Sequence, residues 1–322
     1  MKASTLRFLI VILSAVLIVC LTIAVQLEDA DMDQPPQMQS QPGSSITSQA
    51  QLNSSVTTQP RTSAVTTQST APATSQSRPA GDYIGNLYTR QQLEAMSSQR
   101  TEYSTGLNFD SKNRPINPIR LNEEFGKYDA HFICPDDGKV YLTYNFTYEY
   151  EGMVQKTLDI LKKKNVQCVI FIDKSFAVHH PHMIQQILND GHILANHCTT
   201  HPDLPTLSID KIVDQIMDIH HYVKETFGYE MKLFRPPSGY FSEQVWAIAQ
   251  SLGYRSYNWS FAYRDWDTNN QPKPAAALQT ITDALHSGAI YQLHAISTTN
   301  VAILEDFIDA ARAKGYEFAL LP

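Results

Sequence analysis

The sequence predicts an α/β fold over residues 139–322, a parallel barrel of about seven β/α units, and two observations support this. Short apolar segments rich in β-branched and aromatic residues alternate with segments whose apolar residues recur at helical spacing. The short segments are apolar throughout rather than at every second position, which is typical of strands covered on both faces in a parallel sheet. Such regular alternation indicates a barrel smaller than the usual eight-unit one.

We expect strands and helices to follow each other in turn along this region. The expected strands are 139–144, 166–172, 192–196, 231–234, 254–259, 289–293 and 316–321. The expected helices are 153–165, 181–191, 209–228 and segments near 242–252, 274–287 and 301–314. Terminal signals support two of them. Pro181 begins one helix, and Gly191 ends it. Ser208 caps another, which Gly228 ends.

The first 26 residues predict a membrane anchor. Lys2 and Arg7 precede an uncharged apolar run of eighteen residues, 8–25. As a helix this run is roughly 27 Å long, close to the thickness of the bilayer core. No small-residue cleavage site follows it, which favours an uncleaved anchor over a removed signal peptide. The basic residues before the run predict that the rest of the chain lies outside the cell membrane.

The composition divides the remaining chain into three parts. Residues 27–81 are rich in Ser, Thr, Gln and Pro, with few large apolar side chains, and predict a disordered linker. Residues 82–138 read as an irregular extension that packs on the barrel of residues 139–322. The net charge of −7 argues against nucleic-acid binding, which requires a basic face.

Cysteines give little information on the redox state of the domain. Cys134, Cys168 and Cys198 lie outside the apolar run, and an odd number argues against a disulfide framework. One disulfide bridge between two of these cysteines remains an alternative.

Two histidines follow the expected strand 192–196. His197 and His201 are four residues apart, and on one helical turn their imidazoles would face the same way and clasp a divalent metal. A lone pair of histidines is more often structural. Its place after a strand favours a site, because the chemistry of such barrels lies in the loops after the strands.

Three further strand ends carry polar side chains. Arg235 follows the strand 231–234, and the prolines after it fix the backbone that aims the guanidinium. Asp265 follows the next strand, and we expect it to form a bidentate ion pair with Arg235. His294 ends a further strand. Each could be structural alone, but polar groups at four successive strand ends indicate one site.

The segments HCTTH, RPPSG, RDWD and LH, in this order, resemble the motifs of the polysaccharide deacetylases with a NodB-homology domain, carbohydrate esterase family 4. The resemblance covers residues 139–322. The segments SFAYRDWD and LHAIS resemble loops of the muramic-acid deacetylases, which form δ-lactams in spore-forming bacteria. The resemblance implies a distorted (β/α)7 barrel.

The resemblance also implies a mechanism and its residues. In this family a divalent metal such as zinc, held by one Asp and two His, polarises the N-acetyl carbonyl and a water molecule. A second Asp acts as the base, and a His is the acid for the leaving amine. His197 and His201 match the metal histidines, Arg235 and Asp265 match the pair that positions the base, and His294 matches the acid. Motif positions that also contact substrate fall on Pro236, Gly239, Tyr240 and Trp266.

The first motif departs from the family pattern. The family has T-F-D-D-G after its first strand, whereas this chain has Thr143-Tyr144-Asn145-Phe146-Thr147. Asn145 stands at the position of the base, and an amide cannot take up a proton from water. Phe146 stands at the position of the metal-binding Asp and cannot ligate. We therefore expect metal binding to be weak or absent and hydrolysis to be impaired.

Other acids could replace the missing pair. Glu149 follows the first strand, and Asp173 ends the second at FID; each could equally be a loop acid or a helix cap. Asp137 in PDDG is excluded, because it lies eight residues before Asn145, roughly 26 Å along an extended strand. Cys198 is disfavoured as a ligand because it lies next to His197.

Two functional hypotheses remain. In the first, the chain is a cell-surface protein that binds N-acetylated wall glycan, most of all peptidoglycan muramic acid, without efficient catalysis. In the second, it is an active N-deacetylase that uses substitute groups such as Asp173 or Glu149. In both, the domain is extracytoplasmic, held on the membrane of a Gram-positive bacterium, and its partner is the wall glycan.

Overall fold

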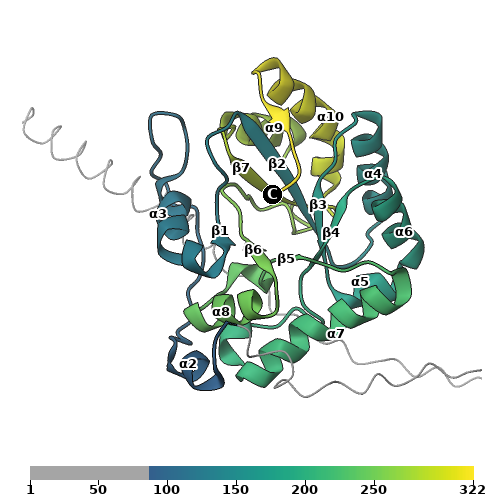
Figure 1. Cartoon of the computed structure of the whole chain (residues 1–322). Coiled ribbons are helices and arrows are strands. Elements are labelled where there is room, and N and C mark those ends of the chain that lie inside the picture. The colour runs from purple at the N-terminus through teal and green to yellow at the C-terminus, as the bar shows by residue number, and fades with distance from the viewer. Residues whose placement is uncertain (1–86) are drawn as a thin grey trace, which may run out of the picture. The chain divides into compact units, whose positions relative to one another are not determined.

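The computed structural model describes residues 87–322 (Figure 1). The predicted anchor of residues 1–26 and the predicted linker of residues 27–81 lie outside the described part of the chain. Within residues 87–322, no helix is both long enough and apolar enough to cross a bilayer.

One parallel sheet forms the centre of the domain. Its strands are β1 (Ala130–His131), β2 (Lys139–Phe146), β3 (Val169–Ile172), β4 (Ile193–Asn196), β5 (Leu233–Phe234), β6 (Arg255–Tyr257), β7 (Ala289–His294) and β8 (Glu317–Phe318). The order across the sheet is β1-β6-β5-β4-β3-β2-β7, and β8 pairs with β2. Every strand pair is parallel. The predicted α/β class and parallel sheet are therefore confirmed.

Helices surround the outer side of this sheet (Figure 1). They are α2 (Arg90–Ala95), α3 (Ile116–Phe125), α4 (Met153–Lys163), α5 (Lys174–His179), α6 (Pro181–Asn189), α7 (Ile209–Phe227), α8 (Glu243–Ser251), α9 (Pro274–Asp283) and α10 (Thr298–Ala313). The predicted caps form at α7. The Ser208 side chain accepts a hydrogen bond from the Lys211 amide, and Gly228 takes the left-handed conformation with φ 67°.

The sheet is curled but does not close through its named strands, because β1 and β7 stand at its two ends. The chain after β6 spans part of this gap. Phe261 forms an isolated parallel bridge with Tyr291 of β7, and the Ser260 amide donates to the Ile290 carbonyl at 2.9 Å. The architecture is thus a curled parallel half-barrel, and this crossing places the loop after β6 against the end of β7.

The extension contributes more than the irregular packing layer that the sequence predicts. Residues 130–131 form β1, which adds an edge strand beside β6. The short helices α2 and α3 also lie in the extension, and α5 occurs directly after β3, where no helix is expected. β1, α2 and α5 have only two to six residues, too few periodic positions to be recognised from sequence. α3 has ten residues but buries only Pro118 and Leu121, so it lacks a clear apolar stripe.

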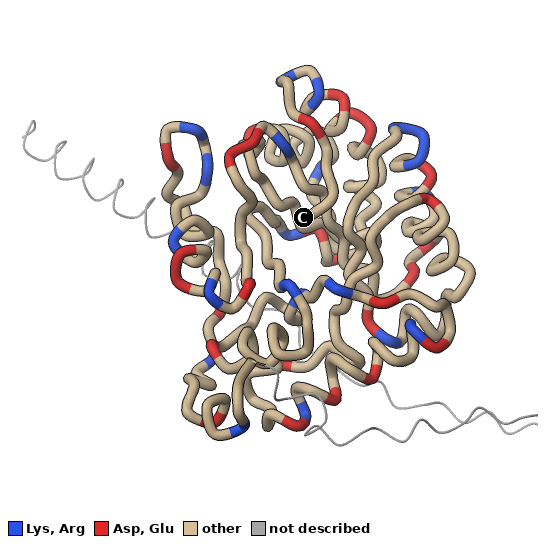
Figure 2. Tube along the Cα trace, viewed as in Figure 1, with Lys and Arg blue, Asp and Glu red and all other residues tan. Residues whose placement is uncertain are grey.

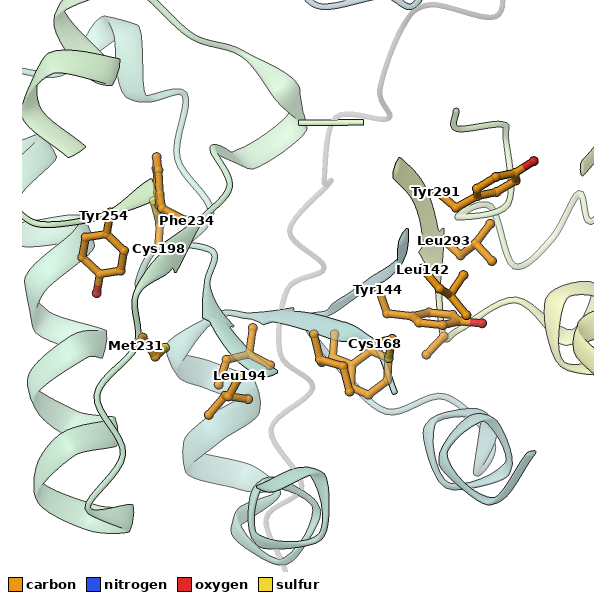
Figure 3. Packing of buried hydrophobic residues seen from close by; sticks show 14 of the residues in the cluster. Leu142, Tyr144, Cys168, Leu194, Cys198, Met231, Phe234, Tyr254, Tyr291 and Leu293 are labelled. Carbon is orange, nitrogen blue, oxygen red and sulfur yellow. The ribbon is translucent and has the colours of Figure 1, made fainter. Parts of the chain in front are cut away.

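Side chains on the two faces of the sheet enter separate hydrophobic clusters. Along β2, Leu142, Tyr144 and Phe146 pack against the helices, in the cluster shown in part in Figure 3. Tyr141 belongs to the second cluster, inside the curl, together with Phe171 of β3. Because side chains alternate along a strand, Thr143 and Asn145 also face the inside. This alternation decides which motif residues can meet at the site.

Charged side chains are spread over the periphery of the domain, and its three cysteines are unpaired. Lys and Arg alternate with Asp and Glu around the periphery in Figure 2, and no basic face gathers in this view. Cys134, Cys168 and Cys198 are all free and buried.

Candidate functional site

A fully buried guanidinium organises the inner end of the sheet. Arg235 has no exposed surface, and its side chain donates four hydrogen bonds, each to a neutral oxygen. The acceptors are the Tyr257 carbonyl (3.0 Å), Asn145 Oδ1 (3.0 Å), Thr143 Oγ1 (2.9 Å) and the Asn258 carbonyl (3.1 Å). These contacts join β2, β5 and the chain after β6.

Local backbone structure fixes the direction of Arg235. Its amide donates to the Asn196 carbonyl at 3.0 Å, which extends the pairing of β4 and β5 by one residue. Pro236 follows and restricts the backbone. The guanidinium carbon lies 4.0 Å from the centre of the Phe171 ring, in cation–π geometry. Burial lowers the pKa of Arg235 to about 9, so the group stays charged at neutral pH at a cost in stability.

The predicted ion pair between Arg235 and Asp265 is wrong. Asp265 instead contacts His294: its Oδ1 lies 2.7 Å from His294 Nδ1, and its Oδ2 accepts from the His294 amide at 2.8 Å. Asn300 Nδ2 also donates to Asp265 Oδ2, at 2.6 Å. The reason is the loop after β6, which carries Asp265 across to β7 while Arg235 points toward β2. No carboxylate of residues 87–322 forms an ion pair with Arg235.

The Asp265–His294 pair can orient an imidazole for proton transfer. Because a carboxylate only accepts hydrogen bonds, His294 Nδ1 carries the proton toward Asp265, and Nε2 is the other exchangeable position. The His294 side chain is 21% exposed, whereas that of Asp265 is fully buried. An acid for a leaving amine needs this combination of a fixed ring and an accessible edge.

His197 and His201 lie together, but not on a helical turn as the spacing predicts. Residues 197–203 form a loop, and Cys198 and His201 adopt positive φ angles of 70° and 56°. The two ring centres are nevertheless 5.0 Å apart. The two residues with left-handed backbone conformation turn the loop sharply, and this turn, not a helix, brings the two rings together.

One ring nitrogen of His197 has no hydrogen-bond partner among residues 87–322. Nδ1 donates to the Arg235 carbonyl at 2.8 Å, so the buried Nε2 is the unprotonated, unpartnered nitrogen. Burial, followed by the nearby His201, lowers the pKa of His197 well below its ordinary value. The pKa of His201 is lowered too, first through lost hydration and then through His294, although the residue as a whole is exposed.

This donor set does not fit a three-ligand metal centre. The bare Nε2 of His197 suits a metal ligand, yet residues 87–322 contain no group of three His, Cys, Asp or Glu side chains that could hold an ion. We therefore derive no chemical step through a metal. Weak metal binding stays a prediction.

Phe146 explains why the first motif cannot supply the third ligand. Its side chain is 1% exposed and lies on the helix side of β2, with ring centres 5.8 Å from Tyr144 and 5.6 Å from Phe176. The strand keeps its pairing as far as Phe146, opposite Ile172 of β3. The residue at this position therefore points away from the histidines as well as lacking a donor atom.

The two substitute acids differ in how they are bound. Asp173 caps α5, where its Oδ1 accepts from the Phe176 amide at 2.8 Å, and burial raises its pKa to about 6. Glu149 lies in the loop after β2, and both of its carboxylate oxygens are shielded from water without a hydrogen-bond partner in residues 87–322. Asp137, the excluded acid, binds Lys139 at the opposite end of β2.

The predicted substrate-contacting positions lie in the loops after β5 and β6, which we call the rim. Gly239 has φ 70°, and a Cβ there would lie 2.5 Å from the Trp259 ring, so only glycine fits beside this indole. The Arg100 guanidinium covers Tyr240 at 3.8 Å from the ring centre. Trp266 is half-buried and lies 5.2 Å from the Arg264 guanidinium.

Three residues at this site escape the sequence motifs. Tyr103 of the extension donates its hydroxyl proton to the Trp259 carbonyl and packs edge-on against that indole. Asn300 holds Asp265 from the start of α10. The sequence offers no signal for Tyr103, which lies far from every motif. Trp259 ends a predicted strand and Asn300 follows LHAIS closely, but neither position identifies a role.

Comparison with known proteins places this geometry in a family. A family model described as polysaccharide deacetylase matches residues 133–257. The peptidoglycan-N-acetylmuramic acid deacetylase PdaA of Bacillus subtilis is 37% identical over 201 residues, which are 62% of this chain and 76% of that protein. The chain belongs to the polysaccharide deacetylase family. The resemblance noted from the sequence motifs is therefore confirmed.

Solved structures of polysaccharide deacetylases agree. The structure of B. subtilis PdaA, a family 4 carbohydrate esterase, matches with a TM-score of 0.64 and 32% identity, over 70% of this chain and 96% of that one. A mutant of BA3943, a family 4 pseudoenzyme from Bacillus anthracis, with restored enzymatic activity, matches with a TM-score of 0.56 and 25% identity. It covers 60% of this chain and 69% of that one. The family thus includes members named as deacetylases and a member named as a pseudoenzyme.

Proposed function

We propose that this chain is a cell-surface member of the polysaccharide deacetylase family that binds N-acetylated wall glycan, with peptidoglycan muramic acid as the preferred target, and that hydrolyses its amide poorly or not at all. The site would bind sugar through the rim of Tyr240 and Trp266 and through the His294–Asp265 pair. The base and the third metal ligand are the missing functions.

One observation carries this proposal. Asn145 occupies the position of the base, and its Oδ1 is held by Arg235 at 3.0 Å, so the group that should take a proton from water is a neutral amide. The second loss agrees with the first. Phe146 lies in the hydrophobic cluster on the helix side of the sheet, and within residues 87–322 no Asp or Glu completes a three-residue group with the two histidines.

The relatives support the choice of ligand. The B. subtilis relative is named as a deacetylase of peptidoglycan N-acetylmuramic acid, and the Listeria monocytogenes relative PgdA, 29% identical over 164 residues, as one of peptidoglycan N-acetylglucosamine. The B. anthracis pseudoenzyme supports the idea that a barrel of this family can persist without activity. Both the anchor of residues 1–26 and the linker of residues 27–81 would suit a domain that reaches into a Gram-positive wall.

The test combines binding with catalysis. The full-length chain, purified in detergent, is mixed with purified peptidoglycan sacculi, and both sedimentation with the sacculi and release of acetate are followed. We expect the chain to sediment with the sacculi while acetate stays at the level of a protein-free control. Acetate release that grows in proportion to protein would contradict impaired hydrolysis, and failure to sediment would contradict glycan binding.

A second candidate function, an active N-deacetylase, is favoured by the state of Glu149. A carboxylate whose two oxygens are shielded and lack donors is costly unless a ligand or ion satisfies it. Asp173 is a weaker substitute, because the α5 cap already occupies its Oδ1. On this alternative, acetate release should be lost in Glu149→Gln and kept in Glu151→Gln, a matched change at an exposed neighbour. Equal effects of the two changes would exclude Glu149.

A further inference from the structure

The orientation of the Asn145 side chain is settled by its partner. A guanidinium can only donate hydrogen bonds, so the atom that faces Arg235 Nη1 at 3.0 Å has to be the amide oxygen Oδ1. The neighbouring donor position of Arg235 is also taken, because Nη2 donates to Thr143 Oγ1 at 2.9 Å, and that hydroxyl donates onward to the Tyr291 carbonyl. Nδ2 of Asn145 therefore points away from the guanidinium.

This Nδ2 group is free to meet a ligand. It makes no hydrogen bond within residues 87–322, and it is not one of the unpartnered polar atoms shielded from water. Asn145 keeps 7% of its surface exposed at the end of β2. Its pairing partner on β7 is His294, so the free N–H₂ lies beside the imidazole that matches the family's acid. Where the family presents a carboxylate that accepts hydrogen bonds, this chain presents a donor.

The charges around Asn145 also favour an uncharged acceptor group as the ligand. Arg235 is positive and has no carboxylate partner in the described chain, while the Asp265 carboxylate is already bound by His294 and Asn300. A carbonyl oxygen is favoured beside the Arg235 charge, whereas an ammonium ion is repelled by it and finds the Asp265 carboxylate already bound.

We propose that Asn145 donates a hydrogen bond through Nδ2 to the carbonyl oxygen of an intact N-acetyl group, so that the site selects N-acetylated sugar over the free amine. This inference rests on the proposed glycan-binding function and adds the residue and the chemical feature that decide specificity. A deacetylase must release the amine product. A protein that only binds N-acetylated wall glycan also has to bind the free amine weakly, so that it stays on the acetylated form.

Changing Asn145 to Asp should reverse the preference. The variant carboxylate would pair with Arg235, remove the donor and place negative charge near the sugar nitrogen. We expect Asn145→Asp to bind acetylated glycan about tenfold more weakly, the result of losing about 1.4 kcal/mol, and to bind the amine form more tightly. A residue with a purely structural role would weaken both forms alike.

The experiment uses purified sacculi in two states. One portion is fully N-acetylated with acetic anhydride, and the other is de-N-acetylated with alkali. Affinities of the full-length wild type, Asn145→Asp and Asn189→Asp are measured by sedimentation, and thermal melting verifies that each variant is folded. Asn189 is the exposed last residue of α6, and that helix leads into the start of β4, away from the site. Asn189→Asp adds the same negative charge there and keeps the oxygen that accepts from Gln185.

The expected result is that wild type and Asn189→Asp prefer the acetylated sacculi, and that Asn145→Asp loses or reverses this preference. The same ratio of affinities in all three proteins, or a wild type that prefers the amine form, would overturn the inference and leave glycan binding intact. A folded wild type that binds neither form would instead overturn the proposed function itself.

Discussion

The buried charge of Arg235 predicts that Asn145→Asp stabilises the fold. The two side chains have nearly the same shape, so the change exchanges a neutral acceptor at 3.0 Å for an ionised one. Two unit charges at that distance attract by roughly 5 kcal/mol at an effective dielectric constant of about 20. Loss of hydration by the new carboxylate, at a position only 7% exposed, offsets much of this gain. We expect a net stabilisation of about 1–3 kcal/mol.

The pH dependence of this gain has a definite sign. A carboxylate beside Arg235 has a lower pKa in the folded chain than its unfolded value of about 3.9. Its stabilisation is therefore complete above about pH 5 and is lost as the pH falls through the folded pKa. Chemical denaturation at about pH 7 and about pH 3 measures both values.

Two variants complete this test. Asn145→Ala removes the acceptor and should destabilise the domain by about 1–3 kcal/mol, because a buried donor of a charged group loses its partner. Asn189→Asp should change stability by less than about 0.5 kcal/mol. If Asn145→Asp proves less stable than wild type at about pH 7 while Asn189→Asp is unaffected, Arg235 is not a charged, unpaired group, and the reasoning fails.

Three further predictions concern the surroundings of the site. Phe146→Asp should destabilise the domain by about 3–5 kcal/mol, because it buries a carboxylate in an aromatic cluster; a stable Phe146→Asp protein in denaturant titrations would mean that this side chain can turn toward the histidines. Asp173→Asn keeps the helix cap. The folded pKa of Asp173, about 6, exceeds its ordinary value, so the folded chain holds the proton more tightly than the unfolded chain. As the pH rises from about 4 to about 6, the free energy of unfolding of the wild type should therefore fall by about 1–3 kcal/mol relative to the variant, and parallel stability curves would refute this. Gly239→Ala should cost about 2 kcal/mol or more through its contact with Trp259 and its positive φ, which a normal melting temperature would contradict.

The alternation of strands and helices was predictable because it depends on long, repeated patterns. Seven of the strands overlap predicted segments, although β2 continues to Phe146 and β7 to His294, and α7 has the cap at Ser208 and the end at Gly228 that its sequence indicates. The extension was not predictable in the same way. The two residues of β1 acquire strand geometry only through pairing with β6, a contact more than a hundred residues away.

The site shows the same division between local and distant information. The sequence correctly predicted that Asn145, Arg235 and His294 lie at one edge of the sheet, because the ends of parallel strands meet there. The partner of Asp265 could not be predicted from the sequence, since it depends on how the loop after β6 crosses to β7. The side of the sheet that Phe146 faces follows from strand alternation, but only once the strand is known to continue through that residue.

The central claim is that the first motif of this chain can no longer complete a metal-dependent hydrolase. Zinc content of the full-length protein, measured by elemental analysis after equilibration with zinc and removal of the free ion, tests it most directly. The account predicts far less than one zinc per chain and the same low value in His197→Ala. One zinc per chain in the wild type, lost in His197→Ala, would contradict it.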